Sequence, residues 1–125
     1  MGWSVYGTKE FYEWFESLPR DGKLEMGTKV NLLPEFGPHL KRPHADTLHE
    51  SKLANLKELR GRTFSGVYRA TFIFDESRQG ILLIGGNKKG KNQKKFYKDL
   101  IKTSEDLFEK YENYKWKEDD KWKNK

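Results

Sequence analysis

The spacing of hydrophobic residues predicts a short strand and a helix at the start of the chain. Residues 3–6 alternate large and small side chains, as short strands do. After them, helical spacing relates four apolar residues, namely Phe11, Trp14, Phe15 and Leu18. Thr8 is expected to cap this helix, and Pro19 is expected to end it.

A second helix and a loop are predicted next. The helix would carry the apolar residues Leu24, Met26, Val30 and Leu33. Asp21 is its expected cap, although Gly22 and Gly27 reduce its helical propensity. The loop is indicated by Pro34, Gly37, Pro38 and Pro43.

From about residue 54 the spacing changes to two, which indicates strands. The first strand has one face made of Leu56, Glu58 and Arg60. The next strand has two faces, one with Val67, Arg69, Thr71 and Ile73 and the other with Tyr68, Ala70, Phe72 and Phe74. Residues 75–80 are expected to turn into the apolar run 81–84, which suits a strand buried on both faces. These strands predict an antiparallel meander.

A last helix is predicted after the strands, and Asn92 is its expected cap. Its apolar stripe, which can lie on the sheet, consists of Phe96, Leu100, Ile101, Leu107, Phe108 and Tyr111. The stripe ends after residue 113. We therefore expect one domain over residues 1–114, followed by a basic, Trp-containing and flexible tail at residues 115–125.

The predicted elements indicate an α+β fold with N-terminal helices, a central antiparallel sheet of about four strands and a C-terminal helix packed beside the sheet. The chain has 125 residues, of which 34% are hydrophobic and 35% charged. Such a chain has a single small core, which depends on its 14% aromatic residues.

The composition favours a polyanionic partner and excludes thiol chemistry. The formal net charge of +6 favours nucleic acid first and an acidic protein second. The chain has no cysteine, which excludes disulfides, thiolate catalysis and thiolate metal sites. Neither a signal peptide nor a membrane-spanning run is recognisable, so a cytoplasmic protein without membrane contact is expected.

Neither a metal site nor a nucleotide-binding motif is predicted. His39, His44 and His49 recur every five residues, a spacing that neither a helix nor a strand turns into one face. A local turn hydrogen bond is the favoured interpretation of His44 and Asp46. Because Gly85, Gly86 and Gly90 lack the spacing of a phosphate loop, no cofactor is expected.

The basic residues form the one constellation that could carry chemistry. Arg60 and Arg69 lie on predicted neighbouring strands, and lysines follow the buried strand, so their charges could converge on one phosphate. In the alternative interpretation, Arg69 only pairs with Glu58 across the sheet and the lysines are solvated. Tyr97, early in the last helix, would be either a core residue or a hydroxyl at the pocket edge.

Four short motifs occur in an order that resembles the RelE/ParE superfamily of toxins from toxin–antitoxin pairs. They are Leu59-Arg60, Tyr68-Arg69, Lys88-Lys89 and Tyr97. Residues 43–48 followed by residues 55–60 resemble its HigB-like, phage-derived branch in particular. The resemblance implies a RelE-like microbial-ribonuclease fold and a metal-independent endoribonuclease, an mRNA interferase that cleaves mRNA at the ribosome and so inhibits translation. It also implies a cognate antitoxin of helix-turn-helix type.

The resemblance assigns candidate site residues by number. The catalytic candidates that it implies are Arg69, Arg60, Lys88, Lys89 and Tyr97. Positive charge alone adds the candidates for RNA binding, which are Lys57, Lys91, Lys94 and Lys95. The general base is left open, because Glu58 stands where some members have a lysine. Lys57, Lys88 or Lys89 could act as the base if surrounding positive charge lowered its pKa.

Two further functions remain compatible with the sequence. A ParE-like toxin that inhibits gyrase would have the same fold and would not need the basic residues of a nuclease. A non-catalytic, basic RNA-binding protein of phage origin would need the charge alone.

Overall fold

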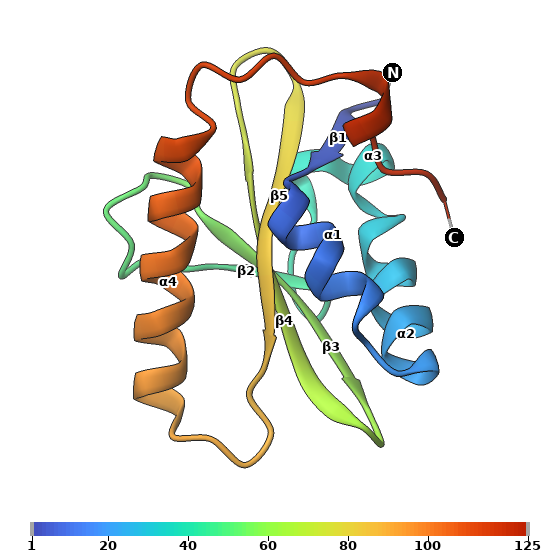
Figure 1. The fold of residues 1–125 in the computed structure, drawn as a ribbon, viewed down its shortest axis with the longest axis vertical. Helices are drawn as coiled ribbons and strands as arrows, with labels where there is room; N and C mark the ends of the chain where they lie inside the picture. The colour runs from blue at the N-terminus through green and yellow to red at the C-terminus, as the bar shows by residue number, and fades with distance from the viewer. Residues whose placement is uncertain (1, 125) are drawn as a thin grey trace.

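The computed structural model describes residues 2–124 as a five-stranded sheet with helices on both faces (Figure 1). The strands are β1 (Ser4–Gly7), β2 (Ala45–Thr47), β3 (Lys57–Thr63), β4 (Gly66–Phe74) and β5 (Gln79–Asn87). The helices are α1 (Lys9–Glu16), α2 (Arg20–Val30), α3 (Leu33–Phe36) and α4 (Gln93–Lys110), with short 3₁₀ turns at Gly37–His39 and Glu118–Asp120. The predicted α+β class, with its C-terminal helix beside the sheet, is confirmed.

The sheet differs from the prediction in its edges. Its strand order is β1-β5-β4-β3-β2. The meander β3-β4-β5 is antiparallel as predicted, but β1 joins β5 in parallel, so the sheet is mixed. Residues 45–47 form β2, which pairs with residues 57–59 and was not predicted as a strand. His44, just before it, lies in a turn, where its amide donates a hydrogen bond to the Lys41 carbonyl at 3.0 Å, and Asp46 accepts one from the neighbouring Thr47 amide at 2.9 Å.

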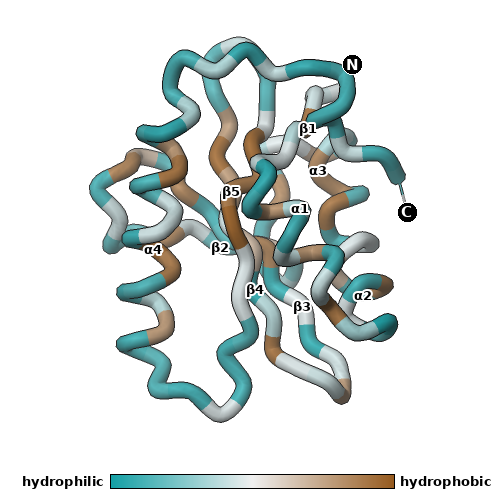
Figure 2. Tube along the Cα trace, in the orientation of Figure 1, coloured by the Kyte–Doolittle hydropathy of each residue, from teal (hydrophilic) through white to brown (hydrophobic). Residues whose placement is uncertain are grey.

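The two faces of β4 separate two hydrophobic clusters, as its alternation predicts. Tyr68, Ala70 and Phe72 pack on the side of α1 and α2. Ile73 packs on the side of α4, with Ile101 and Leu107 of that helix. In Figure 2 the hydrophobic residues of β5 lie between these two layers.

Two helix caps are confirmed and one is wrong. The hydroxyl of Thr8 accepts a hydrogen bond from the Phe11 amide at 2.9 Å, and the side chain of Asn92 accepts one from the Lys95 amide at 2.9 Å. Pro19 stands at the cap position of α2 without a side-chain hydrogen bond. Asp21 lies in the first turn, where it accepts a hydrogen bond from the Ser65 hydroxyl at 2.6 Å.

The C-terminal segment does not fit the expected flexible tail, because Trp122 is part of the core. Its side chain is 6% exposed and its indole donates a hydrogen bond to Asn31 at 2.8 Å. The Trp122 amide also donates to the Val5 carbonyl at 2.8 Å, beside β1. The described part of residues 115–125 therefore covers the β1 edge. The domain boundary after residue 114 stays a prediction.

No helix within residues 2–124 is long and apolar enough to cross a membrane.

Candidate functional site

A carboxylate and two guanidinium groups form the centre of the candidate site. Arg60 and Arg69 are register partners on β3 and β4, and Glu58 shares their face because it lies two residues before Arg60. Arg60 Nη1 lies 2.7 Å from Glu58 Oε2, and Arg69 Nε lies 3.6 Å from Glu58 Oε1. The two interpretations of Arg69 are therefore both present in the structure. Arg69 pairs with Glu58, and the two arginines also converge.

This centre is buried but keeps an excess of positive charge. Glu58 is 2% exposed and Arg69 is 4% exposed, whereas Arg60 is half-buried. A buried carboxylate is stable only when it is paired, so Glu58 holds both guanidinium groups in place. One carboxylate cannot neutralise two arginines, and the remaining charge can attract a phosphate.

The first turn of α4 places Tyr97 against Arg69. Gly86 pairs with Arg69 in the sheet, and a Cβ on Gly86 would lie 3.0 Å from the Phe96 ring, so the missing side chain allows the helix to approach. Arg69 Nε donates a hydrogen bond to the Tyr97 hydroxyl at 2.9 Å, and its Nη1 donates to the Tyr68 carbonyl at 2.9 Å. Burial, followed by the charge of Glu58, raises the pKa of Tyr97, so the phenol stays protonated.

Lys88 lies at the same wall, at the end of β5. Its Nζ is 5.8 Å from the centre of the Tyr97 ring and donates a hydrogen bond to Gln93 at 2.9 Å. Burial lowers the pKa of Lys88, and the charges of Arg69 and Arg60 lower it further. This is the direction that a lysine base requires.

Two hollows meet at Arg60. The α4 hollow, of about 400 Å³, has Glu58, Lys88 and Tyr97 among its lining residues. The β3-edge hollow, of about 550 Å³, lies beside the part of β3 beyond its pairing with β2. One acidic residue, Glu25, lines it together with the cations Lys29, Arg42, Arg60, Arg62 and Arg69. Arg42 and Arg60 line both hollows, so the two are continuous. The excess of positive charge lies in the β3-edge hollow, because the carboxylates of Asp46, Glu50 and Glu58 line the α4 hollow beside Arg42, Arg60 and Lys88.

Comparison with known proteins places the chain in a family. Residues 13–109 match the family described as "Phage derived protein Gp49-like". The chain belongs to this family. It is 39% identical over 98 residues to HigB3 of Mycobacterium tuberculosis, which is named as a proposed toxin, and the match covers 78% of this chain and 83% of HigB3.

A second relative from the same organism, HigB2, is also named as a proposed toxin. The identity is 33% over 109 residues, which are 86% of this chain and 53% of HigB2, so the chain spans about half the length of that relative. The resemblance to the HigB-like, phage-derived branch is thereby confirmed.

The structure brings only part of the predicted site of this Gp49-like chain together. Arg60, Arg69, Lys88 and Tyr97 surround Glu58, as described above. Lys57 points to the opposite face of β3, because neighbouring strand residues alternate, and donates a hydrogen bond to the Pro38 carbonyl at 2.7 Å. Lys89 donates to the Phe64 carbonyl at 2.9 Å, at the β3–β4 hairpin.

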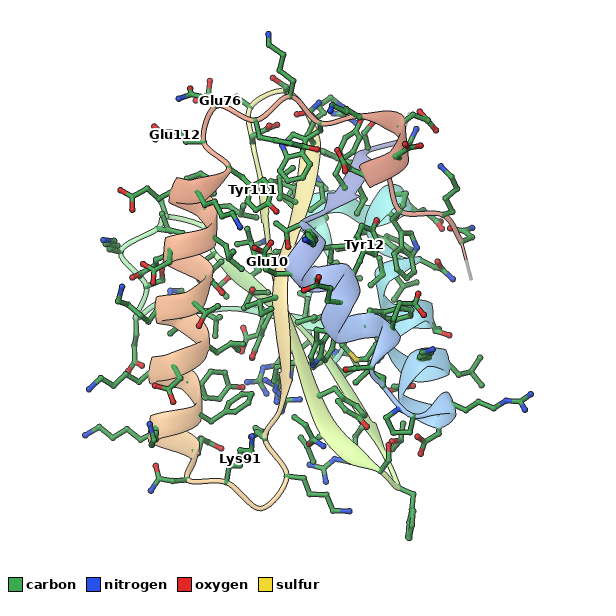
Figure 3. All side chains as sticks on the ribbon, in the orientation of Figure 1. Glu10, Tyr12, Glu76, Lys91, Tyr111 and Glu112 are labelled. Carbon is green, nitrogen blue, oxygen red and sulfur yellow. The ribbon has the colours of Figure 1, made fainter. Side chains whose placement is uncertain are left out.

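The remaining predicted lysines lie around the start of α4, outside the centre. Lys91, Lys94 and Lys95 are exposed, and Figure 3 shows Lys91 in the loop that leads into the helix. Lys95 Nζ lies 3.0 Å from Asp99. These lysines can add charge near the hollows without touching Arg69.

Three cations of the β3-edge hollow, Lys29, Arg42 and Arg62, were not predicted from the sequence. Strand alternation could have found Arg62, which lies two residues after Arg60 on the same face. Lys29 of α2 and Arg42 of the following loop reach Arg60 only through the tertiary fold, so no local pattern indicates them. Lys29 Nζ also lies 3.0 Å from His44 Nδ1.

Within residues 2–124, no three His, Cys, Asp or Glu side chains are grouped in a way that could hold a metal ion.

Proposed function

We propose that this Gp49-like chain is the toxin of a toxin–antitoxin pair and a metal-independent endoribonuclease that cleaves mRNA at the ribosome. The observation that carries the proposal is the position of Arg60. Its guanidinium lies where the basic β3-edge hollow meets the α4 hollow, beside a lysine of lowered pKa and a protonated tyrosine. The names of HigB3 and HigB2 support the toxin role. A cognate antitoxin, of helix-turn-helix type, would bind the chain and keep it inactive.

The proposed reaction is attack of the RNA 2′-hydroxyl on the adjacent phosphorus. Lys88, in its neutral form, takes the 2′-hydroxyl proton as the O2′–P bond forms. Arg60 stabilises the negative charge that develops on the phosphorane from within the hollow, and Arg69 does so from its wall. Tyr97 supplies the proton to the 5′-oxygen as the P–O5′ bond breaks. The products are a 2′,3′-cyclic phosphate and a free 5′-hydroxyl.

One observation favours a second candidate function. Arg69 is almost fully buried and held by Glu58, Tyr97 and the Tyr68 carbonyl, as a purely structural arginine would be. A basic RNA-binding protein without catalysis would show the same contacts, and only measured cleavage distinguishes the two functions.

Pulsed expression without the antitoxin, followed by mapping of RNA ends, tests the proposal. We expect growth arrest, loss of translation and new RNA ends with 5′-hydroxyl groups. Arg60→Ala should reduce these ends by about a hundredfold. Arg78→Ala is the matched control, since Arg78 lies in the β4–β5 turn, stacked on Trp3 at 3.9 Å, far from the hollows. Normal growth with intact transcripts at full expression would remove the proposed function.

Chelation provides an independent check of the metal-independent mechanism. Cleavage by the purified chain should persist in EDTA, because the proposed steps use only Lys88, Tyr97 and the two arginines. Loss of cleavage in EDTA that a divalent ion restores would contradict this mechanism.

A further inference from the structure

The tip of the β3–β4 hairpin displays a phenylalanine to solvent. Phe64 is 95% exposed, which is the highest exposed fraction of any large hydrophobic residue within residues 2–124. Turn positions usually carry small or polar residues, and an exposed ring adds almost nothing to the burial of apolar surface. Packing therefore gives no reason for an aromatic residue here.

Hydrogen bonds hold this turn in place. The hydroxyl of Ser65, the residue after Phe64, lies 2.6 Å from Asp21 Oδ1 and 2.6 Å from the Tyr68 hydroxyl. The Asn87 side chain accepts hydrogen bonds from the Val67 and Lys89 amides, both at 3.0 Å. The turn is thus fastened to α2 on one side and to the end of β5 on the other, so the ring is presented at a fixed place.

Cations connect the ring to the candidate site. Lys89 donates to the Phe64 carbonyl and its Nζ lies 5.5 Å from the centre of the ring. The preceding residue, Lys88, lines the α4 hollow, and Arg62 lines the β3-edge hollow. In Figure 1 the hairpin and the β5–α4 loop point to the same end of the molecule. Arg60 lies three strand residues, roughly 10 Å at the usual rise, before the end of β3 at Thr63, and Phe64 is the next residue.

We propose that Phe64 is a stacking platform for an unpaired base of the RNA, and that Lys89 binds a phosphate next to that base. This inference rests on the proposed function, and it adds that the substrate is single-stranded at a fixed distance from the reacting phosphate. An aromatic ring beside cations is the arrangement that binds single strands without sequence preference, because every base has a π face. The surrounding positive charge favours this partner over an apolar protein surface.

Binding of a non-cleavable RNA by the full chain tests the platform. The probe is an unpaired 2′-O-methyl oligoribonucleotide that carries 2-aminopurine at one position at a time. Phe64→Ala and Phe64→Leu should weaken binding by roughly five- to a hundredfold, whereas Phe64→Trp should retain it. The fluorescence change of the stacked base should disappear in the Ala and Leu variants. Leu24→Ala is the matched control, since Leu24 is an apolar side chain 72% exposed on α2.

Each outcome decides the inference. Melting temperatures should not differ among these variants, because an exposed ring contributes little to stability. Unchanged affinity of Phe64→Ala, or no binding of the probe by the unsubstituted chain, would overturn the platform. Loss of binding to the cognate antitoxin with unchanged RNA affinity would overturn it in favour of a protein contact. Mapping of RNA ends after expression reports on cleavage separately, so the proposed function can stand when the platform fails.

Discussion

Glu58 contacts two arginines that differ in exposure, so the variants of these residues should separate catalysis from stability. Arg69→Ala should lower cleavage by about a hundredfold or more, as loss of a preorganised charge donor does. Arg69→Lys should recover only part of this, because a point charge cannot replace a planar fork. Arg60→Ala should lower cleavage similarly while the melting temperature changes less, since Arg60 is half-buried. Cleavage rates and thermal unfolding check these expectations.

Glu58→Ala is the structural counterpart of these variants. It leaves two guanidinium groups without their carboxylate, and removing one partner of a buried ion pair costs about 3–5 kcal/mol of unfolding free energy. Glu58→Gln is the comparison for Glu58→Ala, because it keeps the volume of the side chain and removes only the charge. A stable and fully active Arg69→Ala protein would end the catalytic assignment of Arg69.

Lys88 should impose a pH dependence on cleavage. Its pKa is lowered by burial and by the neighbouring arginines, so the neutral base forms at a lower pH than in a solvated lysine. The rate should therefore rise with pH up to this lowered pKa and level off above it. Lys88→Arg should remove the rise, because arginine stays protonated. Lys57→Arg should keep it, although burial also lowers the pKa of Lys57. A profile of kcat/KM against pH that falls over this range would assign the base elsewhere.

At the scale of elements, local signals predicted what local interactions determine. The caps Thr8 and Asn92 could be predicted because a cap bonds to an amide only three residues along the chain. The parallel pairing of β1 with β5 joins segments about 75 residues apart, and no periodicity reports such a contact. The three residues of β2 are too few to show alternation. The same limit applies to the site, where shared strand faces indicated Arg60 and Arg69 but not Lys29 or Arg42.

The C-terminal segment should stabilise the fold through Trp122. This ring packs against Phe15 at 5.2 Å and stacks with Tyr12 at 6.4 Å between ring centres. Trp122→Ala should lower the free energy of unfolding by about 3–5 kcal/mol, as the loss of a buried aromatic side chain does. Trp116→Ala is the control, because Trp116 is only half-buried and the loss should be smaller. Denaturant unfolding measures both, and an unchanged midpoint for Trp122→Ala would show that Trp122 does not hold the C-terminal segment to the core.

For the whole molecule, the effect of the net charge of +6 on RNA binding depends on where the charges lie. The β3-edge hollow gathers five cations against the carboxylate of Glu25. Arg60 and Arg69 share Glu58 and Arg42 pairs with Asp46, so the hollow still keeps an excess of positive charge. Many exposed lysines elsewhere pair one to one with acidic residues, as Lys95 does with Asp99 and Lys102 with Asp106. An unpaired cation displaces counterions when it meets a phosphate, whereas a paired one must first leave its partner. The hollows, more than the total charge, should therefore determine affinity for RNA.

This difference predicts which substitutions change the salt dependence of RNA binding. The logarithm of the affinity should fall with the logarithm of the salt concentration, by about 0.7 for each phosphate neutralised on a single strand. Arg62→Gln should reduce the slope by about that amount, because Arg62 lines the β3-edge hollow. Lys102→Gln, which removes a lysine paired with Asp106 at 2.7 Å, should leave it unchanged. Titrations of a non-cleavable oligoribonucleotide at several salt concentrations measure the slope for each variant and for the unsubstituted chain. Equal slopes for these three proteins would mean that the RNA does not enter the β3-edge hollow.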